Sequence, residues 1–263
     1  MRPAYFADLD ATTLFSARWT AGFTADELHQ VEGFDGGHCS FMTTGAIRKL
    51  RLLAQAADFV PTTTRSLPQA AAVRFAGAEP EYMIIANGVH ILFRGEIDTD
   101  WAERSAAIVA LAAPADEVLA ACRPAALPYP EVSVKTHSGI VTIALPRTSS
   151  GFTTDHAAAF QEIAVAADYS FSQQGRSIMM LPRGLTKDRA AGEVARRLGA
   201  TLTAAAGDSY LDLGMLGWAD IAVRPRHGEL HGHDVGIRET ETSGVAAGEE
   251  ILDIVAAELG VAL

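Results

Sequence analysis

The chain has 263 residues, of which 49% are hydrophobic and 20% charged, and its formal net charge is -11. This composition is typical of a globular protein, and the length suffices for one α/β domain with a smaller inserted domain. The acidic excess disfavours binding along a nucleic-acid backbone, for which a basic face supplies most of the affinity. An anionic substrate is still allowed, because a bound cation can override the net field within a pocket.

The cysteine content and the apolar runs predict a cytoplasmic location. Cys39 and Cys122 form no Cys-x-x-Cys pair, and we interpret them as two unpaired thiols in a reducing compartment. The opening residues MRPAYFADLD carry acidic groups, where a signal peptide needs an apolar core. No apolar run approaches the roughly 18 residues of a membrane span. We therefore predict a soluble protein with no membrane partner, and the sequence leaves its oligomeric state open.

The first third of the chain predicts the opening of a parallel α/β sheet. An apolar run ends at Asp8, apolar residues then recur at helical spacing, and a second strand leads into a threonine-rich segment. The pair Asn87-Gly88 separates two further apolar runs and indicates a hairpin. In chain order, we predict a strand at 4–7, an irregular segment at 15–35, a helix at 47–57, a strand from 59, and hairpin strands at 83–86 and 91–93.

The middle of the chain changes character and predicts a separately folded α+β insert. Its predicted elements are a helix at 101–122, strands at 132–135 and 140–145, a helix at 155–167 and one final strand. The parallel pattern then resumes, with a helix at 187–198, strands at 201–206 and 221–223, and a C-terminal helix that includes 251–259. We thus predict a core domain of residues 1–94 and 177–263 and an inserted cap domain of residues 95–176.

Acidic residues follow two of the predicted strands, which is where open α/β sheets bind ligands. Asp8 and Asp10 are two apart on an extended segment, so their side chains can face the same site. Two close carboxylates repel, and a shared proton or a hard cation relieves the repulsion. One carboxylate can then act as nucleophile while the other holds or donates a proton.

Two more segments can complete such a site. Asp208 follows a strand and could bind the same cation, and Asp212 could orient a ligating water or Lys187. A transferring phosphoryl group needs fixed donors, for which the Thr63 hydroxyl and the Lys187 ammonium are suitable. A few carboxylates without histidine suit Mg²⁺. Taken singly, each of these residues has an ordinary alternative as a helix cap, a strand end or a solvated lysine.

Together and in this order, the motifs resemble those of the haloacid dehalogenase (HAD) superfamily. The four matching segments are Asp8-Leu9-Asp10-Ala11-Thr12, the segment 60–65 around Thr63, the segment 181–187 ending in Lys187, and Gly207-Asp208-Ser209 with Asp212 and Met215. The resemblance implies a Rossmann-like parallel-sheet core with an inserted α+β cap. It also implies a Mg²⁺-dependent phosphatase that acts on a small phosphorylated metabolite, most simply a sugar phosphate.

The resemblance also implies a role for each matching residue. Asp8 would attack phosphorus to form an aspartyl phosphate, and Asp10 would protonate the leaving oxygen and then activate water. Asp8 would bind Mg²⁺ through its carboxylate, and Asp10 would bind it through its main-chain carbonyl. The remaining implied roles are metal binding by Asp208, support of the metal shell by Asp212, and phosphoryl binding by Thr63 and Lys187.

The insert lies between Thr63 and Lys187, which resembles the type-two cap of the Cof-like and sucrose-phosphatase-like branch. One departure is Thr64, where many members of this branch have glycine. The candidate substrate-binding residues are Thr12, Thr64, Arg65, Asn87 and Arg176. Two other functions stay open: a phosphosugar mutase of the phosphomannomutase type, and a non-catalytic binding module on the same fold.

Three weaker signals have alternative readings. The segment 227–234, H-G-E-L-H-G-H-D, reads as a surface loop near the pocket mouth or as a second metal site. Residues 35–39 read as a turn before a helix or as a substrate loop. Polar residues of the cap that could contact the leaving group are Lys135, His137, Arg147, Gln173, Gln174 and Arg176.

Overall fold

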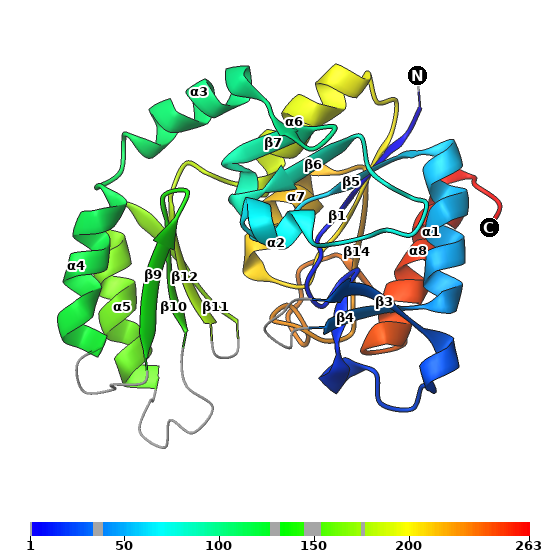
Figure 1. The fold of residues 1–263 in the computed structure, drawn as a ribbon, viewed down its shortest axis with the longest axis horizontal. Helices are drawn as coiled ribbons and strands as arrows, with labels where there is room; N and C mark the ends of the chain where they lie inside the picture. Colours follow the sequence, from blue (N-terminus) through cyan, green and yellow to red (C-terminus); the bar gives the residue numbers. More distant parts are fainter. Residues whose placement is uncertain (1, 34–38, 127–131, 145–153, 175–176) are drawn as a thin grey trace. The chain divides into compact units, whose positions relative to one another are not determined.

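The computed structural model describes residues 2–33, 39–126, 132–144, 154–174 and 177–263. The chain forms two compact units, which are labelled by their elements in Figure 1. The core unit comprises Met1–Asp98 and Thr186–Leu263, and the cap unit comprises Thr99–Leu185. The predicted class, a parallel α/β core with an inserted α+β cap, is confirmed. In the described part of the chain, no helix has the length and apolar character needed to cross a membrane.

Five parallel strands form the sheet of the core unit. In spatial order they are β15 (Arg238–Glu239), β14 (Ile221–Arg224), β13 (Thr203–Ala206), β1 (Ala4–Ala7) and β5 (Asp58–Pro61). The last residue of β1, Ala7, lies opposite Pro61 on one side and Ala206 on the other. Strands β13, β1 and β5 therefore end level with one another, and the residues that follow them emerge at the same edge of the sheet.

Helices cover both faces of this sheet, as the labels in Figure 1 show. On one face, Tyr5 and Ala7 pack into the core beneath α1 (Thr44–Ala56) and α8 (Val245–Leu259). On the other face lie α6 (Lys187–Leu198) and α7 (Leu213–Trp218), where Phe6 meets Trp218 edge to face with ring centroids 5.3 Å apart. The alternation of β1 between two buried faces explains its unbroken apolar run. The helices predicted at 47–57, at 187–198 and at the C-terminus are confirmed.

The prediction that residues 15–35 are irregular was wrong. This stretch and the following one form an antiparallel sheet of order β2-β4-β3, made of β2 (Phe15–Ser16), β4 (Cys39–Thr43) and β3 (Leu28–Gly33). The register of β3 shifts between Gln30 and Glu32, which buries Val31 and Glu32 consecutively. A bulge of this kind breaks the period-two pattern by which strands are recognised. Residues 34–38 lie outside the described part, and Cys39 begins β4.

The predicted hairpin is confirmed and carries a third strand. Its strands are β6 (Tyr82–Ile85), β7 (His90–Phe93) and β8 (Glu96–Ile97). A 3-10 turn, η3 (Ala86–Gly88), joins the first two, with φ of 55° at Asn87 and 95° at Gly88. The shorter helices of the core unit are η1 (Ala17–Trp19), η2 (Ala25–Glu27), α2 (Leu67–Ala71) and η4 (Tyr210–Asp212).

The cap unit packs two helices on a four-stranded antiparallel sheet. The sheet order is β11 (Tyr169–Gln174), β12 (Ser177–Pro182), β10 (Ile140–Ala144) and β9 (Ser133–His137). The one helix predicted at 101–122 is instead two, α3 (Thr99–Val109) and α4 (Ala115–Ala126). Pro114 lies between them and has no N–H with which to continue the first helix. The helix predicted at 155–167 is confirmed as α5 (Thr154–Ala166).

Strand β12 belongs to the cap sheet, whereas the sequence places residues 177–182 in the core domain. It pairs with both β10 and β11 and therefore lies at the centre of that sheet. Whether the cap folds separately, with the predicted boundaries at residues 94 and 176, stays a prediction.

Candidate active site

Asp8 follows β1 at the edge of the sheet where β13, β1 and β5 end, and its backbone is fixed on both sides. Its N–H donates to the Ala206 carbonyl at 2.9 Å, and its carbonyl accepts the Thr13 hydroxyl at 2.6 Å. The next residues turn tightly, because the Leu9 carbonyl accepts three backbone N–H groups, including that of Thr13. Ala11 adopts φ of 62° within this turn. The Asp8 side chain is 8% exposed, so the carboxyl group is largely shielded from water.

Lys187 is the first residue of α6 and lies between two aspartates. Its Nζ donates to Asp8 Oδ1 and to Asp212 Oδ1, each at 2.6 Å, and the residue is 1% exposed. Burial alone lowers the pKa of this ammonium group, but the charges of Asp212 and Asp8 outweigh burial and raise it above the ordinary value. Lys187 therefore stays charged, and its charge is shared by two buried carboxylates.

The start of α6 is fixed by the η3 turn, which approaches it closely. A Cβ on Gly88 would lie 2.6 Å from the carbonyl oxygen of Thr186, the residue before Lys187. Glycine at this position, where φ is 95°, lets the two backbones come together. The Asn87-Gly88 pair thus contributes to placing the lysine as well as turning the hairpin.

Asp208 follows β13 and is 8% exposed. Neither of its carboxylate oxygens accepts a hydrogen bond from the described residues. Burial, followed by the charges of Asp8 and Asp212, raises the pKa of this carboxyl well above its ordinary value. Gly228 has φ of 86° and allows the next loop to reach the carboxyl, since a Cβ there would lie 2.7 Å from Asp208 Oδ2. A buried carboxylate without a donor is a suitable ligand for a cation.

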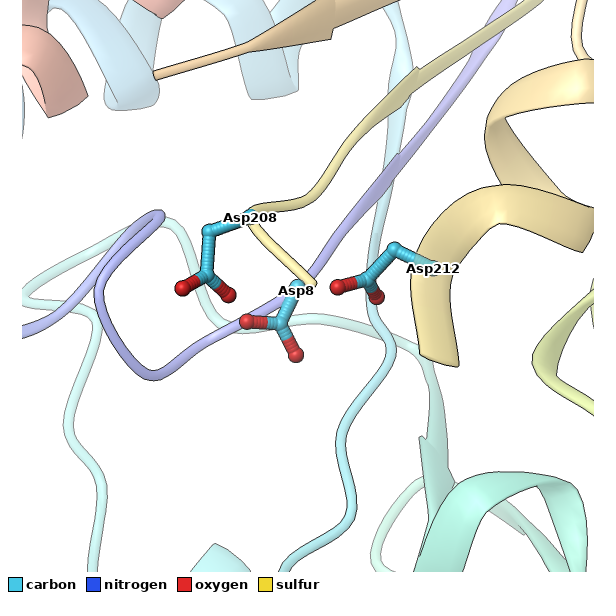
Figure 2. Close-up of side chains that lie close together, drawn as sticks. All are labelled: Asp8, Asp208 and Asp212. Carbon is cyan, nitrogen blue, oxygen red and sulfur yellow. The ribbon is translucent and has the colours of Figure 1, made fainter. Parts of the chain in front are cut away.

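The carboxylates of Asp8, Asp208 and Asp212 lie side by side on three separate segments (Figure 2). Their ligand atoms lie within 4.8 Å of one another, and they are the single such group of three among the described residues. Asp212 is already occupied, because Oδ1 accepts from Lys187 and Oδ2 accepts the N–H and hydroxyl of Ser209 at 3.0 and 2.7 Å. Asp8 and Asp208 are therefore the two carboxylates free to hold a cation.

The charges of this cluster fit a divalent cation. Three buried carboxylates face one ammonium group, and burial together with Asp212 and Asp10 raises the pKa of Asp8 to about 7 against the opposing effect of Lys187. Hard oxygen ligands of this kind suit Mg²⁺, which takes one or two carboxylates with water and phosphate oxygens. The donor set thus fits the Mg²⁺ site that the sequence predicts, with Asp212 as a support for Lys187.

Thr63 lies two residues beyond β5 and is buried. Its N–H donates to the Ile84 carbonyl at 2.8 Å and its carbonyl accepts the N–H of Asn87 at 2.9 Å, so the hairpin fixes its backbone. The hydroxyl accepts the N–H of Arg65 at 3.2 Å and keeps its own proton available for a phosphate oxygen. This placement is compatible with the predicted phosphoryl-binding role, which stays a prediction.

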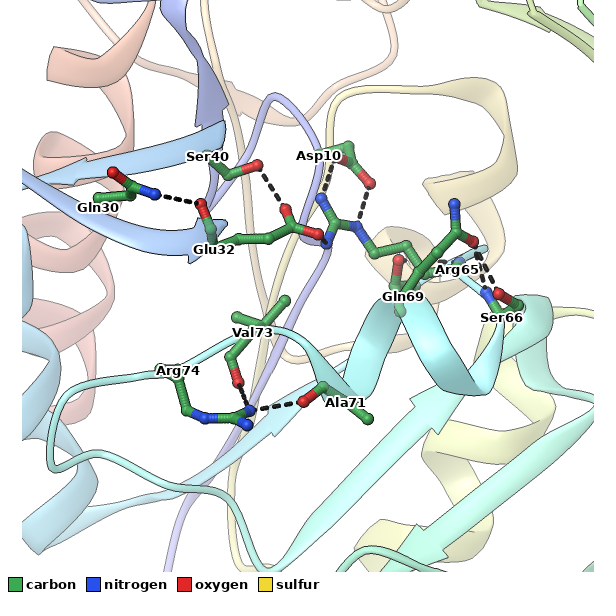
Figure 3. Close-up of polar contacts among 11 residues, drawn as sticks. Asp10, Gln30, Glu32, Ser40, Arg65, Ser66, Gln69, Ala71, Val73 and Arg74 are labelled. Atoms are coloured by element: carbon green, nitrogen blue, oxygen red, sulfur yellow. Dashed lines mark hydrogen bonds and ion pairs between the residues drawn. The ribbon is translucent and has the colours of Figure 1, made fainter. Parts of the chain in front are cut away.

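Asp10 is held by Arg65, as Figure 3 shows. Arg65 donates from Nε and Nη2 to the two oxygens of Asp10 at 2.8 Å, and from Nη1 to Glu32 at 2.9 Å. Glu32 in turn accepts the Ser40 hydroxyl at 2.7 Å, and its side chain is only 6% exposed. Sequence reasoning missed Glu32, because it lies in the stretch predicted to be irregular. With its guanidinium engaged by two carboxylates, Arg65 is placed to orient Asp10, and its predicted contact with substrate stays a prediction.

The other candidates are distributed over both units. Thr12 is buried, with a hydroxyl that has no partner among the described residues, and Thr64 is half-buried. Arg176 and Arg147 lie outside the described residues. The remaining cap candidates lie on two strands, Lys135 and His137 on β9, and Gln173 and Gln174 on β11. Their predicted contacts with a leaving group stay predictions.

The three histidines of segment 227–234 point to different partners. His227 is buried and contacts Ala11, whereas His231 and His233 are exposed. His231 Nδ1 lies 3.2 Å from Glu239, and His233 Nε2 lies 3.1 Å from the Tyr210 hydroxyl. Among the described residues these side chains form no group of three potential metal ligands.

Neither a protein-family model nor a curated protein sequence matches the chain. Solved structures match it along its whole length. The sucrose-phosphatase of Synechocystis sp. PCC6803, solved with sucrose and phosphate, is 16% identical, with a TM-score of 0.65 and 100% of both chains covered. The HAD subclass IIB sugar phosphatase BT4131 is also 16% identical, with a TM-score of 0.61 over 99% of this chain and 100% of its own.

A third match is the phosphatase-superfamily protein BT1666 from Bacteroides thetaiotaomicron, with 13% identity, a TM-score of 0.62, and coverage of 100% of this chain and 96% of its own. At these identities the likeness establishes the fold. The chain has the fold of the phosphatases of the HAD superfamily. A five-stranded parallel core with an inserted antiparallel cap is also the fold of BT4131, which is described as a subclass IIB protein.

Proposed function

We propose that this chain is a Mg²⁺-dependent phosphatase that hydrolyses a small phosphate monoester through an aspartyl phosphate on Asp8. The observation that carries the proposal is the buried cluster in which Lys187 bridges Asp8 and Asp212, while the Asp208 carboxylate accepts no hydrogen bond from the described residues. The likeness to HAD folds supports the same proposal. Asp8 and Asp208 follow the adjacent parallel strands β1 and β13, Lys187 begins α6, and Asp212 is the last residue of η4.

In the first step, an Asp8 oxygen forms a bond to phosphorus and the ester bond breaks. Lys187 binds Asp8 Oδ1, which leaves Oδ2 as the attacking atom. Asp10 gives its proton to the leaving oxygen, so that an alcohol departs. Thr63 and Lys187 donate hydrogen bonds to the phosphoryl oxygens, whose negative charge spreads in the transition state.

In the second step, Asp10 takes a proton from water as the water oxygen attacks phosphorus. Phosphate leaves and the Asp8 carboxylate is restored, which balances the reaction. Mg²⁺, held by Asp8, the Asp10 carbonyl and Asp208, would neutralise charge on the phosphoryl group and on the nearby carboxylates. Asp10 can carry its proton only when Arg65 no longer holds it as a bidentate carboxylate, so substrate arrival has to loosen that pair.

We propose a sugar phosphate as the substrate class. Two proteins of the same fold are described as a sucrose-phosphatase and a sugar phosphatase.

Phosphate release from a panel of phosphorylated sugars and other metabolites tests the function, with Mg²⁺ and with EDTA. We expect release that needs Mg²⁺, is lost in Asp8→Asn, and is retained in Asp26→Asn, which alters an exposed aspartate of η2. Isomerised product without free phosphate would instead identify a phosphosugar mutase. Absence of both reactions across the panel would favour a non-catalytic binding module.

A further inference from the structure

His227 connects three segments of the core unit that are distant in sequence. The residue is 6% exposed. Its Nε2 lies 2.7 Å from the carbonyl oxygen of Ala11, and its Nδ1 lies 3.2 Å from the backbone nitrogen of Gly244. The ring also lies against Trp19, with centroids 4.6 Å apart and planes tilted by 34°, and it contacts Phe15 in an edge-to-face arrangement at 5.9 Å. The imidazole is thus held by two backbone groups and two aromatic rings.

These contacts define one form of the ring. The backbone N–H of Gly244 can only donate, so Nδ1 of His227 must accept and carries no proton. The proton of the neutral ring is then on Nε2 and is donated to the Ala11 carbonyl. Burial lowers the pKa of His227, although the bond to Ala11 opposes this effect. The neutral form of His227 with its proton on Nε2 is therefore the form that satisfies both hydrogen bonds.

Ala11 is a position at which the backbone needs support. Its φ of 62° lies in the left-handed region, which is strained for a residue with a Cβ. The residue directly follows Asp10, whose side chain is held by Arg65 on the other side. Arg65 thus holds the carboxylate of Asp10, and His227 holds the backbone carbonyl of the next residue, Ala11.

We propose that His227 is a positioning residue for the reaction: by donating Nε2–H to the Ala11 carbonyl it holds the turn that aims Asp10 at the leaving group. The catalytic part of this inference rests on the function proposed above. His227 itself touches no reacting atom. Loss of the hydrogen bond lets Ala11 relax out of the left-handed conformation and moves the Asp10 backbone.

Two substitutions separate the two hydrogen bonds. In His227→Gln, the side-chain amide nitrogen is as many bonds from Cα as Nε2 and can still donate to Ala11. In His227→Asn, the side chain is too short to reach Ala11, but its oxygen takes the place of Nδ1 and can accept from Gly244. Both variants lose the ring that lies against Trp19, and each keeps only one of the two hydrogen bonds. A larger effect in His227→Asn than in His227→Gln therefore reports on the bond to Ala11.

The catalytic readout compares two esters in the presence of Mg²⁺. An alkyl phosphate such as glycerol phosphate needs a proton on its leaving oxygen, whereas p-nitrophenyl phosphate expels a stable anion. For His227→Asn we expect kcat/KM to fall about 100-fold on the alkyl ester and much less on the aryl ester. For His227→Gln we expect values within about tenfold of wild type, the loss of one hydrogen bond. Equal losses on both esters, or equal behaviour of both variants, would overturn the proposal.

A second readout does not depend on activity. The amides of Thr12, Thr13 and Leu14 donate to the Leu9 carbonyl, so their hydrogen exchange reports the order of the turn. We expect faster exchange there in His227→Asn but not in His227→Gln, and unchanged exchange in His227→Asn would contradict the tether. Absence of phosphate release by wild type would refute the proposed function. The hydrogen-exchange comparison would still decide whether His227 holds the turn.

The wild-type protein supplies a third readout in case His227→Asn does not fold. Nitrogen-15 NMR of the histidine side chains reports which ring nitrogen carries the proton. We expect His227 to be neutral at pH 7 with its proton on Nε2. A proton on Nδ1, or on both nitrogens, would overturn the assignment because neither form can accept the N–H of Gly244.

Discussion

Arg65 binds Asp10 through two parallel hydrogen bonds of 2.8 Å each, and the guanidinium that makes them is anchored by Glu32. The arginine side chain is 10% exposed and that of Glu32 6%, whereas Asp10 is 56% exposed. The buried end of this network is therefore structural, and its exposed end reaches the residue proposed to move protons. Burial by itself lowers the pKa of the Arg65 guanidinium. The nearby Asp10 and Glu32 outweigh burial and raise this pKa above its ordinary value.

Removing the guanidinium should destabilise the protein strongly. Arg65→Met keeps most of the side-chain volume but leaves Glu32 buried without its cation, which costs roughly 3–5 kcal/mol of unfolding free energy. Glu32→Gln in the same background should recover part of that loss, because no buried charge remains. As a matched control, Arg238→Met breaks an ion pair whose side chains are 55% and 50% exposed and should cost less than about 1 kcal/mol. Urea denaturation measures all of these, and equal losses at Arg65 and Arg238 would contradict the buried network.

The close approach of η3 to α6 makes Gly88 sensitive to any side chain. In Gly88→Ala, the new Cβ would lie 2.6 Å from the Thr186 carbonyl oxygen in addition to the strain of a positive φ. Gly95→Ala is the matched control, since Gly95 has φ of 85° but nothing within 4 Å of a new Cβ. We expect the control to lose about 1 kcal/mol from strain alone, and Gly88→Ala to lose clearly more and to reduce turnover by displacing Lys187. Equal free energies of unfolding for Gly88→Ala and Gly95→Ala would show that the η3 backbone does not lie as close to Thr186 as the structure indicates.

The buried ammonium group of Lys187 should be essential for turnover. Lys187→Met removes the donor between Asp8 and Asp212, and we expect kcat to fall by about 10³-fold, as for loss of one donor to transition-state charge. Lys49→Met provides the control, because Lys49 pairs with Glu249 and Asp253 away from the cluster. The measurement is kcat of wild type and both variants on the best ester of the panel. A loss below tenfold at Lys187 would remove it from the proposed mechanism.

The raised pKa of Asp8 predicts how the metal-free protein responds to pH. In the unfolded chain this carboxyl loses its proton near 3.8, whereas burial keeps the proton on it up to about 7 in the folded protein. Between these values the folded state binds the extra proton, so the stability contributed by Asp8 is complete below 3.8 and is lost as pH rises through about 7.

Thermal unfolding of wild type and Asp8→Asn in EDTA tests this dependence, because the variant lacks the titrating group. We expect the unfolding temperature of Asp8→Asn, measured relative to that of wild type, to rise between pH 4 and pH 8. Mg²⁺ should close the difference at pH 8 by binding the wild-type carboxylates. A difference that is constant with pH would contradict a raised pKa for Asp8.

Much of the core could be predicted from the sequence because its signals are local. The buried strand before Asp8 is an unbroken apolar run, and the helix beginning at Lys187 has apolar residues at regular helical spacing. The parallel order then places the ends of β1, β5 and β13 together, so the segments carrying Asp8, Thr63 and Asp208 converge on one edge.

Other features depend on tertiary contacts that leave little trace in a sequence. Glu32 is buried only because a bulge in β3 turns it inward toward Arg65. The histidine-rich segment reads as one unit, yet His227 is buried against Ala11 while His231 and His233 are exposed. The single helix predicted at 101–122 is divided at Pro114, which lies between α3 and α4.

The central claim is that Asp8 becomes phosphorylated during turnover. The most direct test is rapid acid quenching of the enzyme with Mg²⁺ and its best ester, followed by mass spectrometry of the peptide that contains Asp8 and Asp10. The mechanism predicts a phosphorylated peptide with the modification on Asp8, formed on the timescale of turnover and absent in Asp8→Asn and in EDTA. Steady hydrolysis with no phosphate on Asp8 at any time, or with phosphate on another residue, would contradict it.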